Sequence, residues 1–263
     1  MSIFGVLNNN NNYSTSKTNF VVLSMPRSGS NYLCGLLNSH PDILCHHEVF
    51  HRDEIYYSLD HRDGDLNLGT IEERDQYSKK FIRKIWENNF GCSSVGFKIF
   101  PNQHKKAINF VINNHKIKKV ILKRNNYFRS YTSYILAKKT GIYSNLKKSK
   151  SPNHKDKQTK IRVDLDDLDR YIISRNNFFR SVRNRLESTN QSFVEVSYED
   201  LFGGNRISVH QNILNYICVK NSDLLKETHR KQNSSRYLSE IIDNFSDLSE
   251  KYQDSDLAEY LLN

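Results

Sequence analysis

A short polar turn after the first apolar run carries residue types that bind phosphate or sulfate. Residues 20–24 form an apolar, β-branched run typical of a buried strand, Pro26 follows it, and an amphipathic helix is predicted from Asn31. Between them, Arg27 offers a forked cation suited to anionic oxygens, and Gly29 allows close backbone approach. Because N–H groups and the helix dipole favour an anion at a helix N-terminus, the pattern predicts a site for a nucleotide-like anion.

This turn departs from the Walker A phosphate loop, which needs a glycine, four residues and then Gly-Lys-Ser/Thr. No lysine follows Gly29, and Ser24 stands where the other glycine would be. The sequence Pro-Arg-Ser-Gly-Ser-Asn-Tyr-Leu at 26–33 instead resembles the 5′-phosphosulfate loop of sulfotransferases that use 3′-phosphoadenosine 5′-phosphosulfate (PAPS). It is most similar to the arginine version of bacterial carbohydrate sulfotransferases and their Golgi relatives, since cytosolic aryl sulfotransferases carry lysine at the position of Arg27.

The resemblance implies that Arg27 both binds the co-substrate and assists catalysis. The other residues that it assigns to co-substrate binding in this loop are Ser28, Gly29, Ser30 and Asn31.

A second basic motif follows the strand predicted at 117–122. It is similar to the sulfotransferase 3′-phosphate motif, in which an arginine closes a strand and a serine lies about two helical turns later. Arg124 and Ser133 are the matching residues, nine positions apart, and Arg129 matches a second arginine of the arginine-loop relatives. The spacing of eight in cytosolic members would select Thr132 in place of Ser133. An arginine fork and a hydroxyl together suit a phosphate dianion.

Two further segments supply candidates for the chemistry of transfer. Lys98 lies near the end of the strand predicted at 95–100 and matches a catalytic lysine of cytosolic sulfotransferases. Phe100 stands where those enzymes carry their histidine base, so another base is needed. The His-Pro…Glu-x-Phe segment at 40–50 resembles carbohydrate sulfotransferases and implies Glu48 for this role, with His46 and His47 as rivals because histidine titrates near neutral pH.

Tyr198 belongs to a Tyr-Glu-Asp-Leu segment that resembles one near the adenine in these enzymes, so it is a further co-substrate candidate. The basic segment 138–160 has eight lysines and one aspartate, a local charge of +7. In related enzymes an acceptor-side lid lies here, which would suit an acidic acceptor. A solvated surface loop explains the same charges.

The elements around these motifs predict one α/β domain with a central parallel sheet flanked by helices, the P-loop, sulfotransferase-like fold. Four strands are expected, at 20–24, 95–100, 117–122 and 193–197, alternating with helices at 31–39, 71–90, 107–113, 126–139 and 164–186. Ligands of such sheets bind beyond the carboxyl ends of the strands, where the motifs lie. Residues 1–17, with an asparagine run, are predicted to be a disordered leader, and 18–263 to be the domain.

Composition and charge indicate the partners, the location and the state of the cysteines. The net charge of +10 over 263 residues favours anionic partners. No transmembrane segment and no secretory signal is expected, which predicts a cytoplasmic protein. The cysteines are scattered without metal-site spacing, so reduced thiols and no metal are expected; they are Cys34, Cys45, Cys92 and Cys218.

The sequence therefore predicts a sulfotransferase that moves the sulfuryl group of PAPS to an acceptor hydroxyl on a carbohydrate or glycolipid, without a metal and without nucleic acid. Two alternatives stay open. One is a P-loop nucleotide kinase with a degenerate loop, which the missing lysine disfavours. The other is a non-catalytic basic protein that binds anions or nucleic acid, for which no zinc-finger or RNA-recognition motif is present.

Overall fold

The computed structural model describes residues 17–60, 62, 64–141, 160–226 and 237–262. The predicted leader at 1–17 lies outside the described residues except for Lys17. Of the basic segment 138–160, only residues 138–141 and 160 are described. The predictions made for these two segments therefore stay predictions.

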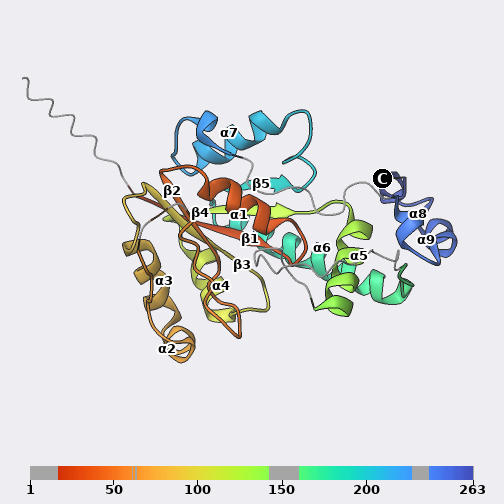
Figure 1. Cartoon of the computed structure of the whole chain (residues 1–263), viewed down its shortest axis with the longest axis horizontal. Coiled ribbons are helices and arrows are strands. Elements are labelled where there is room, and N and C mark those ends of the chain that lie inside the picture. Colours follow the sequence, from red (N-terminus) through yellow and green to blue (C-terminus); the bar gives the residue numbers. More distant parts are fainter. Residues whose placement is uncertain (1–16, 61, 63, 142–159, 227–236, 263) are drawn as a thin grey trace, which may run out of the picture.

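A five-stranded parallel sheet forms the centre of the protein, with the order β2-β3-β1-β4-β5 (Figure 1). The strands are β1 (Thr18–Ser24), β2 (Ile43–Glu48), β3 (Ser94–Ile99), β4 (Ile117–Lys123) and β5 (Val194–Ser197). This confirms the predicted α/β class. Because β1 has β3 on one side and β4 on the other, the chain direction across the sheet reverses at β1, and the loop after β1 lies at this switch point.

Helices cover both faces of the sheet (Figure 1). The longer ones are α1 (Ser30–Asn38), α3 (Ser78–Glu87), α4 (Lys105–Asn113), α5 (Tyr127–Thr140), α6 (Leu165–Ser188), α7 (Arg206–Tyr216) and α9 (Phe245–Tyr252). The shorter ones are α2 (Ile71–Gln76), α8 (Leu238–Ile241) and the 3-10 turns η1 (Ser222–Leu224) and η2 (Ala258–Tyr260).

Alternate side chains of β1 enter two separate cores, as the two-residue repeat of a strand requires. Val21 and Leu23 pack in the core shared with α3, α4 and the second half of α6. Phe20 and Val22 pack on the opposite face against α1 and α7. The strand is apolar on both sides because it is buried on both sides, which is typical of a parallel sheet.

A third core holds the C-terminal part of the chain to the domain. It joins α5 and the first half of α6 to α8 and α9, which lie at the end of the molecule beyond α5 in Figure 1. Two backbone hydrogen bonds link Ile161 to this part, from Ile161 N to Ile241 O (2.8 Å) and from Asp243 N to Ile161 O (2.9 Å). Among the described helices, none is both long and apolar enough to cross a bilayer.

Side-chain caps set the starts of α5 and α6, two of the helices near the site. Asn126 accepts from Arg129 N (2.9 Å) at the start of α5, and Asp164 accepts from Asp167 N (2.9 Å) at the start of α6. Asn and Asp favour this position because the side-chain oxygen satisfies an N–H that has no partner within the helix.

Two predictions of local structure were wrong. The four expected strands omit β2, whose polar residues His46 and His47 are nevertheless buried. The single helix expected at 71–90 is two helices, α2 and α3, which meet at Tyr77, where the backbone leaves the helical region (φ −118°, ψ 44°). The apolar spacing continues across this break, so periodicity alone does not reveal it.

The contact between Gly96 and Phe20 gives a test of the sheet. Gly96 on β3 lies opposite Phe20 on β1, and a Cβ at position 96 would be 2.5 Å from two atoms of the Phe20 ring. Gly96→Ala is expected to lower the free energy of unfolding by about 1–3 kcal/mol, since overpacking a closed core costs this much. Gly204→Ala, where no atom lies within 4 Å of the added Cβ, is the control in urea unfolding. Equal stability of the two variants would contradict this packing.

Candidate active site

The loop from β1 to α1 turns through two left-handed residues. Arg27 has a φ of 68° and Gly29 a φ of 83°. Gly29 caps α1, whose first backbone hydrogen bond runs from Leu33 N to Gly29 O (3.1 Å), and no acidic residue stands in the first turn. The N–H groups and the positive end of the helix dipole therefore face the carboxyl edge of the sheet, as an anion site needs.

Tyr198 and Arg124 close one side of this loop. The Arg124 guanidinium stacks 4.5 Å from the centre of the Tyr198 ring, and Tyr198 N donates to Lys123 O (2.8 Å). A Cβ on Gly29 would lie 2.2 Å from Cδ2 of Tyr198, so only glycine fits against this ring. Gly29, Arg124 and Tyr198, which were predicted from three separate motifs, thus converge on one place.

Arg27 points to α5, where it meets one of the two hydroxyls left open by the sequence. Its Nε and Nη2 donate to Ser133 Oγ at 2.9 and 2.6 Å. Thr132 instead turns its hydroxyl back to the carbonyl of Arg129 (3.0 Å) and is 4% exposed. The hydroxyl nine positions after Arg124, that of Ser133, therefore lies beside the loop, and the one eight positions after it, that of Thr132, does not.

The guanidinium groups of this cluster are crowded. Burial lowers the pKa of Arg27 and of Arg124, and the charge of Arg124 lowers that of Arg27 further. Arg124 Nη1 donates to the carbonyl of Arg27 (3.4 Å), while its Nε is buried without a hydrogen-bond partner among the described residues. Buried cations are costly unless an opposite charge compensates them, so the arrangement suits a bound polyanion.

A second polar cluster adjoins the loop on the β2–β3 side. Lys98 is 1% exposed; its Nζ forms an ion pair with Glu48 Oε1 (3.0 Å) and also donates to Asn31 Oδ1. Gln103 Nε2 donates to Glu48 Oε2 (2.8 Å), and Gln103 Oε1 accepts from Phe100 N (2.9 Å). Both carboxylate oxygens of Glu48 are thus fixed, next to the first turn of α1.

A β-bulge decides which residue of β2 lies opposite Lys98. His46 pairs with Phe97, and Glu48 pairs with Lys98, so β2 has one residue more than β3 at this point. Without the bulge, His47 would lie opposite Lys98. A bulge commonly redirects a side chain next to a functional site, and here it brings Glu48 beside the lysine.

The two rival histidines lie away from solvent. His46 is fully buried, and its Nδ1 accepts from Ser58 N (3.1 Å). Burial, together with the nearby His47 and Arg62, lowers the pKa of His46 to about 3, so it is neutral near pH 7. His47 is 7% exposed, whereas the Glu48 side chain is 22% exposed. Among the three, Glu48 is the most accessible to an acceptor.

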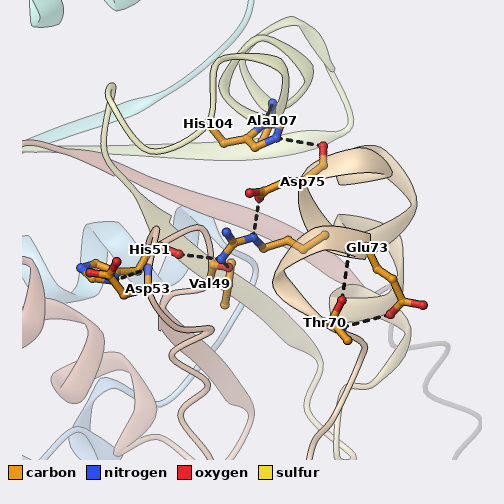
Figure 2. A network of polar contacts seen from close by, with 9 residues as sticks. Val49, His51, Asp53, Thr70, Glu73, Asp75, His104 and Ala107 are labelled. Carbon is orange, nitrogen blue, oxygen red and sulfur yellow. Dashed lines mark hydrogen bonds and ion pairs between the residues drawn. The ribbon is translucent and has the colours of Figure 1, made fainter.

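A buried arginine holds the segment that follows Glu48, through contacts with Val49, His51 and Asp75, which Figure 2 labels. Arg74 on α2 is 1% exposed; its Nη1 donates to the carbonyls of Val49 (3.2 Å) and His51 (2.7 Å), and its Nε pairs with Asp75 (2.7 Å). The start of α2 is in turn fixed by a capping box between Thr70 and Glu73. This frame limits the movement of the backbone next to Glu48.

Three residues near the loop were not predicted from the sequence. Gln103 follows the predicted strand end by only a few positions, so the rule about the carboxyl ends of strands points to it. Tyr171 and Arg175 come from α6, where Arg175 interrupts the apolar stripe between Ile172 and Phe179. A charge on a buried helix face was the feature that could have revealed it.

No group of three or more His, Cys, Asp or Glu side chains within the described ranges is arranged to hold a metal ion. The four cysteines are free thiols, three of them buried.

Gly29 gives a test of the closed loop. Gly29→Ala adds both a left-handed strain and a clash with Tyr198, whereas Gly91→Ala adds the strain alone, since Gly91 has a φ of 81° and nothing within 4 Å of its Cβ position. Gly29→Ala is expected to lose about 1–3 kcal/mol more unfolding free energy than Gly91→Ala. Adding Tyr198→Ala should recover part of that loss, and no recovery would show that the ring is not the cause.

Two curated proteins and two solved structures are similar to the chain. No family model matches the chain. The chain is 29% identical to a Nodulation protein H of Rhizobium tropici over 188 residues (69% of this chain and 68% of that protein). It is 21% identical to a Nodulation protein H of Rhizobium meliloti (strain 1021) over 244 residues (92% and 94%).

Two solved structures are distantly similar. A sulfotransferase from Alicyclobacillus acidocaldarius aligns with a TM-score of 0.45 at 14% identity (93% of this chain and 92% of that chain). The mouse sulfotransferase SULT7A1 complexed with PAP aligns with a TM-score of 0.41 at 12% identity (93% and 88%). The loop sequence, the parallel sheet and the two sequence relatives support a relationship of the chain to the P-loop sulfotransferases.

Proposed function

We propose that the protein transfers the sulfuryl group of PAPS to an acceptor hydroxyl. The observation that carries the proposal is the convergence of Arg27, Arg124 and Ser133 on the loop at the switch point of the sheet. These residues come from two segments far apart in the chain, Arg27 from one and Arg124 with Ser133 from the other, and each segment was assigned to PAPS from its own motif. The arrangement supports binding of a nucleotide that carries anionic groups at both its 5′ and 3′ positions.

In this proposal, different residues of the chain bind different parts of the nucleotide. The N–H groups of the loop and Arg27 receive the 5′-phosphosulfate. Arg124 and Ser133 receive the 3′-phosphate, which distinguishes PAPS from ATP, and Tyr198 lies beside the adenine. Binding of the dianion would compensate the buried charge of Arg124, whose Nε has no hydrogen-bond partner in the described parts of the protein.

Glu48 and Lys98 supply the chemistry of transfer. The Glu48 carboxylate takes the proton of the acceptor hydroxyl, the acceptor oxygen bonds to sulfur, and the bond between sulfur and the 5′-phosphate oxygen breaks. Negative charge grows on that phosphate oxygen as it leaves. In the resting ion pair Glu48 neutralises Lys98 (3.0 Å). Protonation of Glu48 removes this compensation, so the lysine stabilises the leaving oxygen when its charge appears.

The acceptor class follows from the resemblance. The arginine loop and the glutamate base are features of sulfotransferases that act on carbohydrates, so we propose a glycan or glycolipid hydroxyl. Phe100 takes the position of the histidine base of cytosolic enzymes. It is 8% exposed, and the centre of its ring lies 5.4 Å from Lys98 Nζ. The site therefore uses its carboxylate from β2 as the base.

Calorimetry with adenosine 3′,5′-bisphosphate, ATP and 5′-AMP tests the nucleotide site. The bisphosphate is expected to bind at micromolar concentration and the other two far more weakly. Arg124→Ala should weaken the bisphosphate about 10- to 100-fold, since a hydrogen-bonded charge is lost. Arg83→Ala, an exposed arginine of α3, is the control and should bind like the wild type. Equal or absent binding of all three nucleotides would overturn the proposal, and magnesium-dependent turnover of ATP would favour a kinase.

Glu48→Gln tests the base. It is expected to reduce transfer about 10²- to 10⁴-fold, the usual contribution of a positioned base. Affinity for adenosine 3′,5′-bisphosphate should stay equal or become tighter, because Lys98 loses its counter-charge. The measurement is release of the bisphosphate from PAPS with and without a mixture of oligosaccharides, with the exposed Glu87→Gln as control. Near-full turnover with binding intact would contradict the assignment.

A further inference from the structure

Arg175 occupies an unusual position on α6. The apolar stripe of this helix runs through Leu168, Ile172, Phe179 and Val182, and Arg175 falls on the same stripe. Its side chain is buried, with 6% exposure, where an apolar residue would pack without cost. A guanidinium retained in such a place needs specific partners.

Those partners are the phosphate loop and one tyrosine. Arg175 Nη2 donates to the carbonyl of Pro26 (3.1 Å). The guanidinium carbon lies 3.1 Å from the centre of the Tyr171 ring, a stacked contact. The Tyr171 hydroxyl is 2.7 Å from Ser130 Oγ, and Ser130 Oγ donates to the carbonyl of Arg27 (3.4 Å). One connected set of side chains from α5 and α6 thus reaches two consecutive carbonyls of the loop.

These two carbonyls fix the backbone of Arg27. The peptide plane that ends in the Pro26 carbonyl lies before Arg27, and the plane of the Arg27 carbonyl lies after it. The orientations of both planes together define the φ and ψ of Arg27. Its φ of 68° lies in the left-handed region that a side chain disfavours, and such a conformation persists only where its surroundings hold it.

We propose that Arg175 is a positioning residue, which holds the Pro26 carbonyl and so keeps Arg27 in the left-handed conformation that directs its guanidinium to Ser133. The inference rests on the proposed function, because it assigns to this contact a role in binding the nucleotide. It makes Arg175 act through Arg27 and not by touching the nucleotide. Loss of Arg175 lets the backbone at 27 relax, and the Arg27 side chain leaves the anion site.

A double-mutant cycle separates this role from the alternatives. The dissociation constant of adenosine 3′,5′-bisphosphate is measured by calorimetry for the wild type, Arg175→Leu, Arg27→Ala and the double variant, with thermal unfolding recorded for each. Leucine keeps the apolar stripe of α6. Arg175→Leu is expected to weaken binding about 10-fold. In the Arg27→Ala background the same change should alter binding by less than about 2-fold, since the side chain that it positions is absent.

Three outcomes overturn the inference, and one overturns the proposed function instead. Unchanged binding by Arg175→Leu contradicts any role in positioning. A double variant weakened by the product of the two single effects contradicts action through Arg27. Equal weakening by Arg180→Leu, an exposed arginine of the same helix, shows a general effect of the substitution. Absence of bisphosphate binding by the wild type overturns the sulfotransferase proposal. Should Arg175→Leu not fold, Arg175→Met replaces it, because methionine adapts to irregular core space.

Discussion

The site depends on a turn of five residues between the end of β1 at Ser24 and the start of α1 at Ser30. So short a connection requires left-handed backbone at both Arg27 and Gly29. Glycine adopts it without cost, whereas arginine does not. Side chains from α5, α6 and the end of β4 therefore donate hydrogen bonds to the carbonyls of the loop.

Buried positive charge is handled differently on the two sides of the loop. Lys98 is neutralised inside the protein by Glu48. Arg124 and Arg175 meet tyrosine rings and backbone carbonyls, and none of the ion pairs of the described residues includes either of them. The first side is balanced without a ligand, and the second gains from an anionic one. This division suits a site where a proton is removed beside one cluster while a phosphate is held by the other.

Most of the fold was predictable because its elements are local. Four of the five strands are apolar runs ended by a turn, and α6 shows its apolar stripe on both sides of Arg175. The strand β2 was missed because it contains the polar residues His46 and His47, although the sheet buries them. The break at Tyr77 was missed because Tyr77, Phe81 and Ile85 keep a helical spacing from the break into α3, whereas α2 buries only Arg74.

The sequence by itself determined the strand, turn and helix start around Gly29, since they are specified by neighbouring residues. It also singled out Arg124 and the two hydroxyls after it as candidates. Only the tertiary structure decided that Ser133 meets Arg27, and that Glu48 and not His47 lies opposite Lys98. One extra residue in β2 shifts the register against β3, and such a shift moves a side chain to the other face of the sheet. Register is a relation between two strands, so one strand's sequence does not contain it.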